Sequence, residues 1–413
     1  MPDVDLLISG GTLVTAQGRR RAHLAVADGR IHSVTDRPPS ATRTVDASGL
    51  LVLPGGVDTH VHLMDPGGTD REDFPTGTSA AAASGVTTIV EHSHGTPVRT
   101  VDDLRGKTDY LRERSNVDFA LAAHAWPRHA ADVAPLWEAG VAFFKLFTCT
   151  THGVPGHSAA ALRTHLQASA LADAVTLLHC EDESLTEDAE RLLRADGRTD
   201  PGLLTEWRNR DAELVAVAVT ALLVRRTGAR AAVAHVSSAE VASYVREERA
   251  RGARLAAEGC PQYFLLREDE VHEHGALRKF TPPARARTDA DELEMWRLLR
   301  EGVLTHMSTD HAPSTLEQKR AGDVWPATSA CLVSTAPWPC SSTPPRGGTC
   351  RTRTSRGSTA GPLPRPTACG HARGGSVSVR TPTWCWSTRR CTGPYATRTC
   401  CPRRAGRRST VGR

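Results

Sequence analysis

Short apolar runs recur along the middle of the chain, and polar or alanine-rich stretches separate them. Eight such runs, bounded by glycine or polar residues, are typical of buried strands: GVDTHVH, GVTTIVEH, VDFALAAHA, GVAFFKLF, AVTLLHC, ARAAVAHVS, ARLAAEG and GVLTHMSTD. The intervening stretches predict helices that include residues 76–84, 101–114, 159–172, 211–226, 239–249 and 288–300. This alternation predicts an α/β fold with a parallel sheet.

The number of strand–helix units selects the architecture. Eight units over about 250 residues is the size expected of a TIM-like (β/α)8 barrel. A doubly wound open sheet is the alternative, but no glycine-rich phosphate turn follows the first run. We therefore assign residues 55–325 to a barrel, in which chemistry belongs at the carboxyl ends of the strands.

Residues 1–54 follow a different pattern. They contain three strand-like segments, DLLISGGTLVT, AHLAVADGRIHSV and TRTVDASGLLVLPGG. Gly10-Gly11 and Asp28-Gly29 are typical of hairpin turns. We expect a small β-domain here, separate from the barrel.

The last part of the chain differs in composition from everything before it. After Asp323 there is no Asp, Glu or Lys, whereas residues 346–413 contain fifteen arginines. Without these arginines the net charge of +5 becomes −10. Eight of the eleven cysteines also lie from Cys331 onward, without paired C-x-x-C units. A basic nucleic-acid arm or a cysteine scaffold would need clearer regularity.

A shifted reading frame accounts for this composition. Trp384, Cys385 and Trp386 require the codons TGG, TGY and TGG, so the codons that straddle them encode Val and Leu. With GC-rich codons, the straddling frame from Arg380 can read DADLVLVDP, which alternates like a strand. We interpret residues 326–413 as an out-of-frame tail, and we expect it to be irregular or disordered because it cannot bury enough apolar surface.

Ionisable residues collect at the ends of the predicted barrel strands, where burial is costly unless the group is used or paired. They are His60, His62, Lys145, His179, His235 and Asp310. His60 and His62 share one face of their strand because side chains alternate with period two. Imidazoles and carboxylates suit zinc or a similar divalent ion. A carbamate formed from Lys145 and CO2 offers two oxygens that can bridge two metals.

The order H-x-H, K, H, H, D on a barrel resembles the amidohydrolase superfamily, and within it the cyclic amidases: allantoinase, hydantoinase or dihydropyrimidinase, and dihydroorotase. The resemblance implies two divalent metal ions and an N6-carboxylated Lys145. It implies that His60, His62, Lys145 and Asp310 hold one ion, and that Lys145, His179 and His235 hold the other. A hydroxide that bridges the metals would attack the ring amide, with Asp310 as general base and then acid. The family also implies a β-sandwich completed by C-terminal strands, which is incomplete in this chain.

Three residues bear on the identity of the ring. Dihydroorotases resemble one another in an arginine two residues past the H-x-H motif, and Met64 stands there in this chain. Methionine cannot pair with a carboxylate, so we predict a ring without one, unless another arginine such as Arg71 substitutes. KFTPPAR is similar to the family segment whose Ser or Asn contacts the ring amide, and Thr281 would fill that place here. STDHAPS resembles the dihydroorotase signature, but Ser314 replaces the histidine usually found there. Cys149 is expected in the wall of the site and not as a nucleophile, because a metal-bound hydroxide would already supply the attack.

We therefore predict a hydrolase that opens a cyclic amide in the allantoinase or hydantoinase manner. The alternatives are a dihydroorotase and an inactive structural homologue that has lost its C-terminal region. The expected partner is a small-molecule cyclic amide, with no nucleic acid and no membrane, and homo-oligomers are common in the family. No apolar run is long enough for a membrane helix, and no basic segment resembling a signal peptide follows Met1. These features predict a cytoplasmic location.

Overall fold

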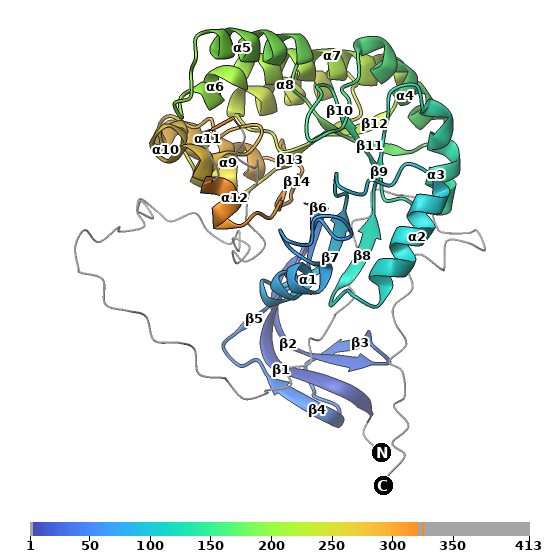
Figure 1. The fold of residues 1–413 in the computed structure, drawn as a ribbon. Helices are drawn as coiled ribbons and strands as arrows, with labels where there is room; N and C mark the ends of the chain where they lie inside the picture. Colours follow the sequence, from blue (N-terminus) through green and yellow to red (C-terminus); the bar gives the residue numbers. More distant parts are fainter. Residues whose placement is uncertain (1–2, 321–323, 326–413) are drawn as a thin grey trace. The chain divides into compact units, whose positions relative to one another are not determined.

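The computed structural model describes residues 3–320 and 324–325, which belong to two units divided after Pro54 (Figure 1). The predictions for residues 326–413 lie outside the described residues. We describe each unit by itself.

The first unit is a β-sheet with strand order β3-β2-β1-β4, in which β5 also pairs with β1. Its strands are β1 (Val4–Thr15), β2 (Gly18–Ala27), β3 (Arg30–Thr35), β4 (Ala41–Asp46) and β5 (Leu51–Val52). Val4, Leu7 and Ala25 form one small buried cluster of this sheet. Ile31 and Val34 are exposed. The described residues thus supply a single sheet of the expected sandwich.

One of the two predicted hairpin turns is present and the other is wrong. Asp28 and Gly29 have positive φ angles of 52° and 69° and connect β2 to β3, as predicted. By contrast, β1 runs straight through Gly10 and Gly11, where its register with β2 shifts in a bulge. A Cβ on Gly11 would lie 2.6 Å from Val52 Cγ2, so this glycine permits close packing of β5.

The second unit has its strands in the order expected for a (β/α)8 barrel, and every pairing between them is parallel. The eight predicted runs contain β6 (Gly56–Val61), β7 (Val86–Glu91), β8 (Asp118–Leu121) with β9 (Ala123–His124), β10 (Phe144–Phe147), β11 (Val175–His179), β12 (Arg230–Val233), β13 (Leu255–Gly259) and β14 (His306–Met307). The predicted fold class is confirmed.

The strands do not form one closed ring within the described residues. One sheet contains β6-β7-β8 and the other contains β14-β13-β12-β11-β10-β9. Only Ala122 separates β8 from β9, so the third barrel strand takes part in both sheets. On the other side, Val61 forms an isolated parallel bridge with His311, just beyond β14.

Helices follow most strands, and several of them pack against the outer faces of the two sheets (Figure 1). They are α1 (Phe74–Ala83), α2 (Val101–Arg112), α3 (Val133–Ala139), α4 (Ala159–Leu171), α5 (Glu183–Ala195), α6 (Leu203–Trp207), α7 (Arg210–Thr227), α8 (Ala239–Ala250), α9 (Gln262–Leu265), α10 (Glu268–His274), α11 (Asp289–Arg300) and α12 (Leu316–Arg320). Several of them start with a side-chain cap: Thr288 and Asp291, for example, form a reciprocal capping box at α11. No helix in the described ranges is long and apolar enough to cross a membrane.

Alternation along β10 explains how a lysine comes to face the barrel interior. Leu146 packs in the large apolar cluster beneath the helices, whereas Phe143 belongs to a separate cluster with Val175, Leu177 and small alanines. Lys145 is two positions from Phe143 on the strand and lies on the same face, so its side chain points inward. On the adjacent strand β11, His179 is two positions from Leu177, so its side chain lies on the same inner face as that of Lys145.

Candidate metal centre

A cavity of about 290 Å³ lies at the carboxyl ends of the parallel strands. All six residues that the sequence singled out as metal ligands line it: His60, His62, Lys145, His179, His235 and Asp310. Apart from Asp310, whose side chain is 14% exposed, these side chains are almost completely buried. The fold thus gathers six groups that are up to 250 residues apart in the sequence.

The donor atoms of these residues lie close together. Asp310 Oδ1 is 2.9 Å from His60 Nε2 and 3.3 Å from His62 Nε2. Lys145 Nζ is 3.2 Å from His60 Nε2. A second group is formed by His179 Nδ1 and His235 Nε2, which are 3.0 Å apart. Two ligands at about 2.1 Å from one zinc ion in tetrahedral geometry are separated by about 3.4 Å, so the spacing of these donors fits metal ligation.

Hydrogen bonds on the far side of three imidazole rings fix which nitrogen can act as a ligand. His60 Nδ1 donates to Glu258 Oε1 at 2.7 Å, and His62 Nδ1 donates to the carbonyl of His92 at 3.0 Å. His179 Nε2 donates to Glu181 Oε2 at 2.7 Å. Because these oxygens are hydrogen-bond acceptors, the nitrogen that faces each of them carries the hydrogen, and the other nitrogen of the ring is the one left for a metal. In all three rings that nitrogen belongs to the donor groups described above.

The two carboxylates that orient these rings were missed by the sequence analysis. Burial alone would raise the pKa of Glu258, but the charge of His60 holds it well below its usual range. Burial also opposes ionisation of Glu181, and the Arg208 guanidinium at 3.0 Å contributes most to lowering its pKa to about 2. The acid within the apolar run ARLAAEG was a usable signal for Glu258. Nothing local marked Arg208 as the partner of Glu181.

The two histidines of the H-x-H motif have pKa values shifted in opposite directions. Burial lowers the pKa of His62 to about 4, and the hydrogen bond to Asp310 only partly opposes this. Burial acts in the same direction on His60, but Glu258 and Asp310 outweigh it and raise its pKa to about 9. Without metal, His60 therefore holds a proton that a cation at this position would displace.

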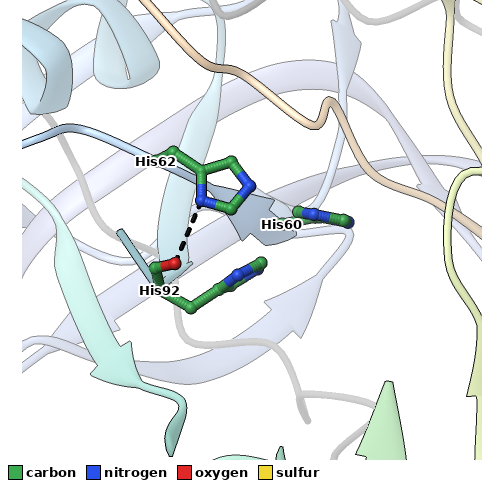
Figure 2. Close-up of side chains that lie close together, drawn as sticks. All are labelled: His60, His62 and His92. Atoms are coloured by element: carbon green, nitrogen blue, oxygen red, sulfur yellow. Dashed lines mark hydrogen bonds between the residues drawn. The ribbon is translucent and has the colours of Figure 1, made fainter. Parts of the chain in front are cut away.

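His92 adds a third imidazole beside His60 and His62 (Figure 2). Its ring centroid lies 4.5 Å from that of His60 and 4.4 Å from that of His62. Both ring nitrogens are buried and have no hydrogen-bond partner among the described residues. The sequence analysis did not select His92, although it is the last residue of the second apolar run, GVTTIVEH.

Backbone strain concentrates around the cavity. Four non-glycine residues of its wall have positive φ angles: Met64 (59°), His152 (54°), His235 (35°) and Asp310 (53°). Such conformations are costly for these residues and persist where the surrounding structure enforces them, often at functional sites. At Asp310 the enforcement is visible, because the preceding Thr309 is held by hydrogen bonds from its backbone and hydroxyl to Asp58.

The predicted substrate contacts divide into two groups. Met64 and Thr281 line the cavity, and Thr281 Oγ1 lies 3.4 Å from His152 Nε2. Ser314 is buried but is not part of the lining, so the cavity gives no support for its predicted contact. Arg71 and His94 also line the cavity, and the sequence analysis had named only Arg71, as a substitute cation.

Cys149 forms a close group with His179 and Glu181. We interpret this group as an orienting network, because His179 and Glu181 are hydrogen-bonded to each other and Arg208 donates to both Glu181 and Cys149. Burial raises the pKa of the Cys149 thiol to about 12. A thiol with this pKa is a poor nucleophile at neutral pH.

Comparisons with known proteins agree with this architecture. Residues 51–335 match the model of the Amidohydrolase family. An allantoinase from Streptomyces avermitilis is 35% identical over 330 residues, which cover 77% of this chain and 72% of that protein. An allantoinase from Deinococcus radiodurans is 33% identical over 325 residues, covering 78% of this chain and 72% of that protein.

Solved structures give the same result at the level of the fold. The L-hydantoinase (dihydropyrimidinase) from Arthrobacter aurescens superposes with a TM-score of 0.76 at 27% identity, covering 81% of this chain and 76% of that one. A D-hydantoinase structure gives a TM-score of 0.75 at 28% identity, covering 81% and 75% of the two chains. The resemblance inferred from the ligand pattern is thereby confirmed: this chain is a member of the amidohydrolase family.

Proposed function

We propose that this protein hydrolyses a C–N bond of a cyclic amide such as allantoin or a hydantoin. The observation that carries the proposal is the convergence of six donor residues on one cavity at the strand ends. The similarity to allantoinases and hydantoinases supports this choice of substrate class. Met64 in the cavity wall supports a ring without a carboxylate, and dihydroorotase is the alternative.

The donor set fits two divalent ions, for which zinc is our proposal. His60, His62, Lys145 and Asp310 would hold one ion, and Lys145, His179 and His235 would hold the other. When bound, two such ions would lower the pKa of a water molecule and polarise the carbonyl of the ring. The relevant properties of the chain are therefore the preset imidazole tautomers and the carboxylates that orient them.

Lys145 would contribute as an N6-carboxylated lysine. Its side chain is almost fully buried, and burial lowers the pKa of its amine against the opposing attraction of Asp310 and Glu258. A lower pKa leaves more of the neutral amine, which is the form that adds to CO2 with release of one proton. The resulting carbamate would supply two oxygens in place of one weakly ligating amine.

Asp310 would carry the proton during hydrolysis. Burial opposes its ionisation, but His60 and the hydrogen bonds from His60 and His62 keep the pKa of Asp310 well below its usual range. An ionised carboxylate can accept a proton from the attacking water and then deliver it to the ring nitrogen that leaves. The strained backbone at Asp310 would hold the carboxylate in position for both steps.

The out-of-frame interpretation of residues 326–413 is also a proposal. The match to the family covers only the first ten of these residues and leaves residues 336–413 unmatched, which supports it. Sequencing the coding DNA around codon 326 tests it directly, because we expect an insertion or deletion there. An intact reading frame would refute this interpretation and would leave the tail as a genuine feature. An inactive structural homologue remains the alternative for the chain as it stands.

A substrate panel tests the proposed function. The 413-residue chain and a frame-repaired version, both loaded with zinc, would be assayed on allantoin, hydantoin, dihydrouracil and dihydroorotate. We expect allantoin or hydantoin to be opened fastest. Dominant activity on dihydroorotate would refute the carboxylate-free ring, and no hydrolysis by either protein would refute the enzyme proposal. Size-exclusion chromatography with light scattering would test the homo-oligomer proposed from the family, and subcellular fractionation would test a cytoplasmic location.

A further inference from the structure

Arg71 lies in the cavity wall, and one nitrogen of its guanidinium has no hydrogen-bond partner among the described residues. It lies in the loop between β6 and α1, and its Nε donates to the carbonyl of Pro313 at 2.6 Å. Its Nη2 is buried and has no hydrogen-bond partner among the described residues. A buried guanidinium nitrogen without a partner is costly, so this position favours a ligand that supplies an acceptor.

The carboxylates next to Arg71 in the sequence do not satisfy it. Asp70 accepts a hydrogen bond from Gln318 at 2.8 Å, and Glu72 pairs with His311 at 2.8 Å. Asp65, nearby in the same loop, is bonded to Arg114 at 2.8 Å. None of these acids forms an ion pair with Arg71 among residues 3–320.

The two residues beside Arg71 in the cavity wall, Met64 and Gly68, offer its guanidinium no side-chain oxygen acceptor. Met64, which lines the same wall, offers only a thioether, and its sulfur already accepts from Ser93. Gly68 lies between the two: a Cβ there would be 3.4 Å from Met64 Cβ and 3.8 Å from Arg71 Cδ. The absence of a side chain at Gly68 keeps this part of the wall open beside the guanidinium.

Arg71 is also connected to the loop that carries the proposed base. Its acceptor Pro313 lies three residues after Asp310, so one hydrogen bond ties the β6–α1 loop to the segment that leaves β14. The six proposed ligands lie at the strand ends, whereas Arg71 lies further along, in the loop that connects β6 to α1. A ring whose amide faces the strand-end donors would direct its substituent toward that loop.

We propose that Arg71 binds an oxygen acceptor on the substituent of the substrate ring. This rests on the proposed function and narrows it to cyclic amides that carry an exocyclic acceptor. A ureido carbonyl and a carboxylate share this chemistry, and the planar fork of arginine can pair with either. Together with Met64, which argues against a carboxylate, Arg71 favours a ureido group.

The test compares substituents in wild type, Arg71→Met and Arg71→Lys, each as the zinc-loaded 413-residue chain and as its frame-repaired version. The substrates are hydantoin as reference, allantoin with a ureido group, hydantoin-5-acetic acid with a carboxylate, and 5-isobutylhydantoin with an apolar group. Arg105→Met is the matched control, because Arg105 is 73% exposed on α2. Thermal unfolding would show whether each variant is folded.

We expect kcat/KM for allantoin, relative to 5-isobutylhydantoin, to fall about 10- to 100-fold in Arg71→Met, the usual range for a hydrogen bond to a charged group. The loss should lie mainly in KM, and Arg71→Lys should recover part of it. A loss for hydantoin-5-acetic acid alone would support an acceptor site but identify it as a carboxylate site. An equal loss for every substrate would overturn the proposal, because it would show that Arg71 only holds the loop.

The same experiment separates failure of this inference from failure of the proposed function. If the wild type opens rings but Arg71→Met keeps the wild-type preference, only the role of Arg71 is refuted. If neither form of the wild type opens any of the four rings, the proposed function fails and the role of Arg71 fails with it.

Discussion

Replacement of Glu258 by glutamine is the sharpest test of how this chain would hold a metal. Glu258 is fully buried on β13, and its Oε1 accepts from His60 Nδ1 at 2.7 Å and from the backbone of His235 at 2.9 Å. Glutamine has nearly the same shape and keeps an acceptor oxygen. The change therefore removes the charge and leaves the packing in place, whereas alanine would also create a cavity.

The size of the effect follows from these contacts. A hydrogen bond to a charged group contributes roughly 1.5–3 kcal/mol, against about 1 kcal/mol for a neutral one. Loss of the charge should thus cost His60 about 0.5–2 kcal/mol as a ligand, or roughly a 2- to 30-fold weaker affinity for metal. This overlaps the roughly 10- to 100-fold loss that is usual when an orienting group behind a metal ligand is changed.

The assay is competition for zinc between the protein and a chelator of known affinity, combined with metal analysis after dialysis. Glu248→Gln is the matched control, because Glu248 is also buried but pairs with Arg225 and Arg251 on the outer side of the barrel. Both variants should lose some stability, and only Glu258→Gln should lose zinc. A zinc affinity of Glu258→Gln within twofold of wild type would refute the reasoning.

Three further predictions use other parts of the barrel. Lys145→Ala should lose zinc, with partial rescue by a short carboxylic acid; unchanged zinc content would exclude the carbamate. Cys149→Ser should keep kcat within about threefold, since this buried thiol is no nucleophile, and complete inactivation would contradict that. Burial lowers the pKa of His165 to about 3, so its contribution to stability is present above pH 6.5 and is lost as the pH falls toward 3. Between pH 6.5 and 4.5 this loss of stability is about 2–3 kcal/mol. Urea denaturation should therefore show that the stability of His165→Gln falls less with acid than that of wild type. The same pH dependence in both proteins would refute this prediction.

The sequence by itself determined the architecture and the selection of the main site residues. Eight apolar runs contain the strands because burial on both faces of a parallel sheet demands continuous hydrophobicity. The same demand makes an ionisable side chain conspicuous, which is how Lys145 and His235 were found. Local patterns were ambiguous where one signal serves two structures: glycine permits both a turn and a bulge, and at Gly10 only the pairing of β1 with β2 decided between them.

Tertiary structure alone decided the partners of those residues. Glu258 lies 198 positions from His60, and Arg71 lies 242 positions from Pro313, so no local pattern could pair them. The orientation of the His60 ring depends on an acceptor supplied by another strand, and the open side of Arg71 depends on acids that are bonded elsewhere. The sequence therefore determined which groups the barrel must accommodate, because burial of charge is costly wherever it occurs. The folded chain determined what each group faces, because hydrogen bonds and ion pairs depend on distances in space.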